Sequence, residues 1–221
     1  DQVDHHAQHE LNKNLHFPKG QSLSTTLSPA DYTKLQEFFA SEFGVAKKVF
    51  TKRYNHIKPL ALSIIMTRLS LKEGVKYYDI ELLKMANANN IAAYSLETID
   101  RESEALNKFE ITEQAKALMH SVNNFNTQKQ EFLKLMEDYP DGDAEEIFRY
   151  TLHPFEDNPT FLEEFYTKRN AEWMAKIDKM LHEESAFIAV GVSHLEGDKG
   201  LIALLKAKGY TLTPVPVKRR N

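Results

Sequence analysis

One histidine of this sequence stands at a position where histidines can do chemistry. His194 closes the tetrapeptide GVSH, directly after the apolar run 187–190, in the stretch FIAVGVSHLEGDKGLIALLKAKGYTLTPV. This stretch predicts a strand buried on both faces, a sharp turn, a helix that ends at Gly209 and a second strand. Ligands of α/β proteins lie outside the carboxyl ends of strands, so an imidazole there can bind a metal ion or act as an acid or base near pH 7. The structural alternative is a histidine packed within a loop, because one ligand does not make a metal site.

The other histidines form weaker patterns. His5 and His9 are four residues apart in HHAQHE, a spacing that places both on one face of a helix. This is not an HExxH zinc motif, because position 6 carries His6 rather than the general-base glutamate. Near a chain end, these three side chains are expected to be solvated. Four further histidines have no partner at ligand spacing, namely His56, His120, His153 and His182.

The composition excludes several classes of function. The net charge is −4 and the basic residues are spread along the chain, which argues against a nucleic-acid partner. The sequence contains no cysteine, so disulfides, thiolate chemistry and Cys-based zinc sites are excluded. It also contains no apolar run of about 18 residues, the length that a membrane-spanning segment needs. The 221 residues suffice for one sizeable core, or for a core with an attached subdomain.

Helices are the main predicted elements that must position His194. Ser28 as N-cap, Pro29 in the first turn and Gly44 as terminator predict one helix. Further helices are predicted from Pro59, over 79–90, over 112–139 and over 159–184. Few strands accompany them, the clearest being 91–97 and the two of the closing stretch. We therefore predict a helix-rich α/β fold with a small mixed sheet and flanking helices.

Four stretches, in order along the chain, resemble the TraB/GumN family, also called TraB/PrgY/GumN, to which the TIKI metalloproteases are similar. They are FPKGQSLSTTLSPADYTKL, YYDIELLKMANANNIAAYSLET, YTKRNAEWMAKIDKML and the closing stretch quoted above. The resemblance implies an α/β core related to the erythromycin-esterase and ChaN-like folds. It implies a single domain over 1–221, with a mainly helical insertion at about 28–90 and a helical segment at about 100–183.

The family's proposed site uses two GxxH motifs, a glutamate at a strand end and an arginine. The resemblance carries the second GxxH motif onto Gly191 to His194, the arginine onto Arg169 with Asn170 beside it, and the glutamate onto Glu97. The family's first GxxH, usually GTIH, and the acidic strand after it would precede residue 1. The chain is therefore expected to be amino-terminally incomplete relative to the family.

Each transferred residue also has a structural interpretation. Arg169 is either an anion clamp that stabilises a developing oxyanion or the partner of a nearby glutamate, Glu163 or Glu172. Glu97 is a ligand, a general base or the orienting partner of His194, or else it caps the helix that follows. Asn170 is expected to orient a neighbour. Trp173, the single tryptophan, lies on an apolar helix face and is expected to be core.

The resemblance implies a metal-dependent hydrolase of peptidase type. A divalent metal ion (Mn, Co or Zn) at His194 and at upstream ligands would activate water. The alternative is a non-catalytic peptide-binding or regulatory protein, or one that takes part in envelope polysaccharide export. Haem or iron binding is a third alternative. We expect a peptide or small-molecule substrate, a homo-oligomer, and a periplasmic or cell-envelope location in a bacterium.

Overall fold

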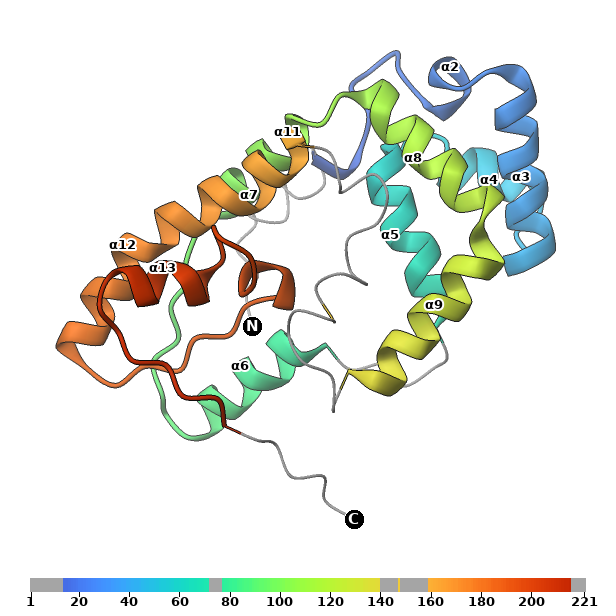
Figure 1. The fold of residues 1–221 in the computed structure, drawn as a ribbon. Helices are drawn as coiled ribbons and strands as arrows, with labels where there is room; N and C mark the ends of the chain where they lie inside the picture. Colours follow the sequence, from blue (N-terminus) through green and yellow to red (C-terminus); the bar gives the residue numbers. More distant parts are fainter. Residues whose placement is uncertain (1–13, 72–76, 140–146, 148–158, 216–221) are drawn as a thin grey trace. The chain divides into compact units, whose positions relative to one another are not determined.

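The structure is a computed structural model of the chain, and it describes residues 14–71, 77–139, 147 and 159–215 (Figure 1). The chain divides into two compact units. The first comprises residues up to 75 together with 99–130, and the second comprises 76–98 together with 131 onward. Helix α9 (Phe125–Asp138) begins in the first unit and ends in the second. No described helix combines the length and the apolar character that crossing a membrane requires.

The first unit is a small helical bundle. Its helices over 29–43 and from Pro59 begin where the sequence predicts, whereas the helix predicted over 112–139 is divided at Asn124 into two helices. Ser28 accepts a hydrogen bond from the backbone N–H of Asp31 (3.1 Å), and Gly44 ends the same helix with φ at 66°. Both features confirm the prediction of a capped helix over 29–43. The helices of this unit are α2 (Leu23–Thr26), α3 (Pro29–Phe43), α4 (Lys47–Arg53), α5 (Pro59–Ser70), α7 (Ile99–Asn107) and α8 (Ile111–Asn123).

Aromatic residues fill the core of the first unit. The ring of Phe39 is fully buried, and its centroid lies 4.8 Å from that of Phe50 and 5.2 Å from that of Phe43. Helices α5 and α8 pack against each other and contribute buried residues such as Leu62 and Leu118. Each such side chain stabilises the fold by about 1.5–3 kcal/mol.

The second unit is built on one long helical stretch. Its elements are α6 (Tyr78–Ala88), α11 (Pro159–Leu162), a π-helical turn (Glu163–Thr167), α12 (Lys168–Glu183), a 3₁₀ turn (Val192–His194) and α13 (Leu201–Ala207). The helix predicted over 159–184 is thus confirmed, with a π-turn that the sequence did not reveal. Its core is a cluster of buried side chains from α12 and α13, namely Trp173, Met174, Ile177 and Leu201.

The predicted α/β fold with a small mixed sheet and an erythromycin-esterase or ChaN-like core is wrong for the part of the chain that the structure describes. There, no residue lies in a strand, and the one β-type pairing is an isolated antiparallel bridge between His16 and Ile57. The segments predicted as strands, 91–97, 187–190 and 210–215, contain no helix, and no ladder of backbone hydrogen bonds joins them. A sheet needs neighbouring strands about 4.8 Å apart, whereas here single side chains such as Leu96, Ile188 and Tyr210 contact α12 and α13.

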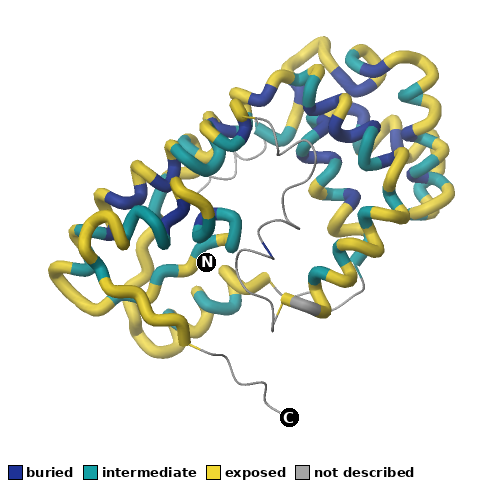
Figure 2. Tube along the Cα trace, in the orientation of Figure 1, coloured by how far each residue is buried: buried dark blue, intermediate teal, exposed yellow. Residues whose placement is uncertain are grey.

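The segment 187–190 shows why its apolar run was misleading. Ile188 and Val190 pack against the cluster formed by α12 and α13, whereas Phe187 between them and the end of the helix is 82% exposed. Side chains alternate across an extended backbone, so a helix on one side covers only every second residue. Helices α12 and α13 therefore cover only one face of this segment. Exposed and half-buried positions alternate along it, in the colours of Figure 2.

Candidate functional site

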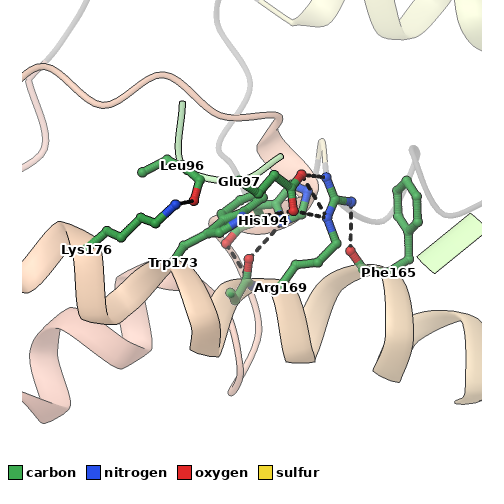
Figure 3. A network of polar contacts seen from close by, with 8 residues as sticks. Leu96, Glu97, Phe165, Arg169, Trp173, Lys176 and His194 are labelled. Atoms are coloured by element: carbon green, nitrogen blue, oxygen red, sulfur yellow. Dashed lines mark hydrogen bonds and ion pairs between the residues drawn. The ribbon is translucent and has the colours of Figure 1, made fainter. Parts of the chain in front are cut away.

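The residues singled out in the sequence come together in the second unit, on one face of α12. Arg169, Asn170 and Trp173 lie at spacings of one and four residues, which places them on adjacent rows of a helix. All three are buried, with exposures of 5%, 1% and 5%. The segment around Glu97 and the loop around His194 meet this face, as Figure 3 shows.

Glu97 and Arg169 form a two-pronged ion pair although 72 residues separate them. The Nε of Arg169 donates to both carboxylate oxygens, at 3.1 and 3.0 Å, and Nη2 donates to Oε1. The third nitrogen, Nη1, donates to the backbone carbonyl of Phe165 at 3.0 Å, and the ring of Phe165 stacks on the guanidinium. The arginine predicted to pair with Glu163 or Glu172 thus pairs with Glu97. Such a bidentate geometry fixes both side chains.

Glu97 receives a further hydrogen bond from the helix. The indole Nε1 of Trp173 donates to Oε2 of Glu97 at 3.2 Å, and Lys176 donates to the carbonyl of Leu96 at 2.7 Å. Both carboxylate oxygens are therefore engaged, and the segment around residue 97 is held on α12 at three places. In this arrangement Glu97 does not orient His194, which was one of the roles predicted for it.

Asn170 is the residue that orients His194. Its side-chain nitrogen donates to the backbone carbonyls of His194 (3.3 Å) and Lys199 (2.9 Å), and because carbonyls only accept, these bonds fix which end of the amide is nitrogen. The amide oxygen therefore faces Nδ1 of His194, at 2.7 Å, and must accept from it. The proton of the neutral imidazole is thus on Nδ1, and the lone pair is on Nε2.

His194 lies in an apolar environment. Its imidazole is 7% exposed, and the ring centroids of Trp173 and Tyr166 lie 4.4 Å and 5.1 Å away. Burial lowers the pKa of His194 from 6.5 to about 4, with Arg169 acting in the same direction and Glu97 opposing it. The imidazole is therefore neutral at physiological pH, as a metal ligand or a general base must be.

The loop after His194 is tightly closed by glycines. Gly197 has φ at +82°, a conformation that favours glycine, and a Cβ on Gly200 would lie 2.3 Å from the carbonyl oxygens of Leu195 and Glu196. The GVSHLEGDKG sequence therefore fixes a compact turn. The backbone carbonyl of Lys199 in this turn is one of the two to which Asn170 donates. The turn thereby couples the loop conformation to the position of the imidazole.

The described residues meet the requirements of a metal site only in part. His194 fits one ligand position, because its tautomer leaves Nε2 as an acceptor and no hydrogen bond to Nε2 is present among the described residues. Glu97 does not fit in its present position, because its oxygens are taken by Arg169 and Trp173. No group of three histidine, aspartate or glutamate side chains that could hold a metal ion occurs among the described residues. His5, His6 and His9 lie outside them.

Sequence reasoning missed two members of the site. Trp173 is core, as predicted, but it also binds Glu97 and covers His194. Its position four residues after Arg169 could have revealed it, since residues at this spacing share a helix face. Tyr166 is contributed by the π-helical turn at 163–167, for which the sequence carries no signal. π-helical turns are frequent at functional sites.

With this geometry described, the chain can be compared with known proteins. It belongs to the TraB/PrgY/gumN family, whose family model matches residues 1–214. This confirms the resemblance noted in the sequence. No match was found among curated proteins or among solved structures.

Proposed function

We propose that this chain contributes His194 to the metal centre of a hydrolase of the TraB/PrgY/gumN family, acting on peptide bonds. The observation that carries this proposal is the hydrogen bond between Nδ1 of His194 and the amide oxygen of Asn170. It holds a neutral imidazole with Nε2 as acceptor, which is the state in which histidine binds Mn²⁺, Co²⁺ or Zn²⁺. Family membership is consistent with the proposal, but a shared family does not define the reaction.

The described residues would support such a centre in distinct ways. Asn170 orients the imidazole, and the glycine-rich loop holds the backbone of His194. The Arg169–Glu97 pair fixes the neighbouring segment and places a guanidinium, paired with a carboxylate, beside the site. A bound divalent ion would lower the pKa of its water and polarise a carbonyl. His194 supplies one ligand, so the remaining ligands come from outside the described residues.

Metal content tests this proposal directly. The full-length protein is purified after growth with Mn, Co or Zn, both unaltered and with His5, His6 and His9 replaced by alanine, so that binding at these three histidines is distinguished from binding at His194. His194→Ala is compared with the parent and with His56→Ala, which removes an exposed histidine of the other unit. We expect stoichiometric metal in the parent and the His56 variant, and its loss in the His194 variant. Equal, negligible metal in all three would refute the proposal.

A second candidate function is peptide binding without catalysis, in regulation or in envelope polysaccharide export. The observation in its favour is that both oxygens of Glu97 are bonded, so this carboxylate is not free to act as a base. A fluorogenic peptide library with the metal-loaded protein distinguishes the two functions. Turnover that is lost in His194→Ala supports the hydrolase, whereas peptide binding that survives this substitution without turnover supports the second function. A cell-envelope location is proposed for either.

A further inference from the structure

Trp173 touches both parts of the site, although nothing in its sequence position separates it from the core. Its side chain is 5% exposed and lies between the Glu97–Arg169 ion pair and the imidazole of His194 (Figure 3). Core packing alone requires only the apolar surface of the indole. Two of its contacts go beyond packing, because they are directional.

The first contact is polar. A buried indole N–H needs an acceptor, and Glu97 provides it at 3.2 Å. Without this bond, Oε2 of Glu97 retains a single described donor, the Nε of Arg169. The carboxylate is then held by Arg169 alone, and Oε2 can accept a hydrogen bond from another donor.

The second contact is with the imidazole itself. The two ring centroids are 4.4 Å apart with a tilt of 39°, and Tyr166 meets the imidazole edge-on at 5.1 Å. The Arg169 guanidinium lies 5.1 Å from the centroid of the indole ring. The indole therefore covers one face of the imidazole and also makes a cation–π contact with the Arg169 guanidinium. Asn170 restrains only Nδ1, so the aromatic contacts decide how far the ring plane can swing about that bond.

We propose that Trp173 is a positioning residue of this site, which completes the hydrogen bonding of the Glu97 carboxylate and holds the plane of the His194 imidazole. This rests on the proposed function in one respect: the benefit of the arrangement is that Nε2 stays available to a metal ion. The geometric part of the proposal concerns the imidazole alone and holds with or without a metal.

Two substitutions separate the two contacts. Trp173→Phe keeps an aromatic ring over His194 and removes the N–H, whereas Trp173→Leu removes both. Ile177→Val is the matched control, because Ile177 is a buried core residue of α12 in the same cluster and has no described hydrogen bond or ring contact with Glu97 or His194. Two quantities are measured at one fixed pH near 7. They are the imidazole tautomer and ring-proton shifts of His194 by ¹H–¹⁵N NMR, and the Kd for Zn²⁺ alone by competition with a chelating dye.

We expect the NMR signals of the parent to show a single Nδ1–H tautomer, with ring protons shifted upfield by the indole. Trp173→Leu should lose the upfield shift and show a mixture of tautomers, and Trp173→Phe should keep most of the shift. For Zn²⁺ we expect affinity to fall on the order of 10-fold in Trp173→Phe, the usual cost of losing a residue that supports a ligand, and further in Trp173→Leu. Ile177→Val should change neither quantity.

An unchanged His194 tautomer in both Trp173 variants would overturn the proposal, and so would an equal loss in Ile177→Val. If the leucine variant does not fold, the phenylalanine variant decides through the same two measurements. If the parent binds no Zn²⁺, the proposed function fails. The NMR result then decides the positioning role alone, since it requires no metal.

Discussion

Lowering the pH should destabilise the second unit through His194. Because burial lowers the pKa of His194 from 6.5 to about 4, the folded chain keeps this imidazole neutral over a range where the unfolded chain protonates it. The neutral His194 makes its full contribution to the free energy of unfolding above pH 6.5. This contribution is lost as the pH falls from 6.5 to 4, and below pH 4 both the folded and the unfolded chain carry the proton. Arg169 and Glu97 are the charged groups beside the imidazole, and their opposing effects are included in this shift.

The size of the effect follows from the two pKa values. Relative to pH 7, proton binding to the unfolded chain should lower the free energy of unfolding by about 2 kcal/mol at pH 5 and about 3 kcal/mol at pH 4. Other groups also titrate in this range, so the quantity to measure is the difference between the parent and His194→Asn. Asparagine places an amide N–H near the position of Nδ1 and does not titrate, which preserves the donor to Asn170.

Trp173 provides the assay. It is the single tryptophan and lies in the same unit as His194, so urea unfolding followed by its fluorescence reports the relevant unit. The parent should lose stability faster than His194→Asn between pH 7 and pH 4. His182→Asn, at a side chain that is 72% exposed, should follow the parent. Parallel stability curves for the parent and His194→Asn over this range would refute the reasoning, because they would show that the fold does not bury a neutral imidazole.

Three further predictions concern the contacts around this histidine. Arg169→Met should cost about 3–5 kcal/mol of unfolding free energy, because it leaves the Glu97 carboxylate without its ion-pair partner. In a double-mutant cycle, Arg169→Met with Glu97→Gln should cost less than the two single substitutions added together. Asn170→Ala should cost about 1–3 kcal/mol for each buried carbonyl left without a donor, measured by urea unfolding, and NMR should show mixed His194 tautomers. Gly200→Ala should destabilise the loop by about 1–3 kcal/mol in thermal unfolding, because the added Cβ would lie 2.3 Å from two carbonyl oxygens. Gly209→Ala is the control: it has open space around it and should cost only the strain of its φ of +91°.

Local signals determined much of the helical structure. A capping serine, a proline in the first turn and a left-handed glycine set the bounds of α3, and these features act through a few neighbouring residues. The apolar spacing of the stretch from Pro159 likewise predicted a long helix, and the motifs identified the family to which the chain belongs. His194, Arg169, Asn170 and Glu97 were all singled out before the structure placed them together.

What the sequence by itself determined was therefore several of the helices and a set of candidate site residues, and what the tertiary structure decided was their pairing. The segments 91–97 and 187–190 are predicted as strands, but a strand needs a partner, and none pairs with them in the described residues. The partner of Arg169 is Glu97, 72 residues away, and the partner of His194 is Asn170. Trp173 joins these pairs through its N–H and its ring. Hydrogen bonds and ring contacts act over a few ångströms in space, so residue spacing along the chain does not reveal them until packing brings the segments together.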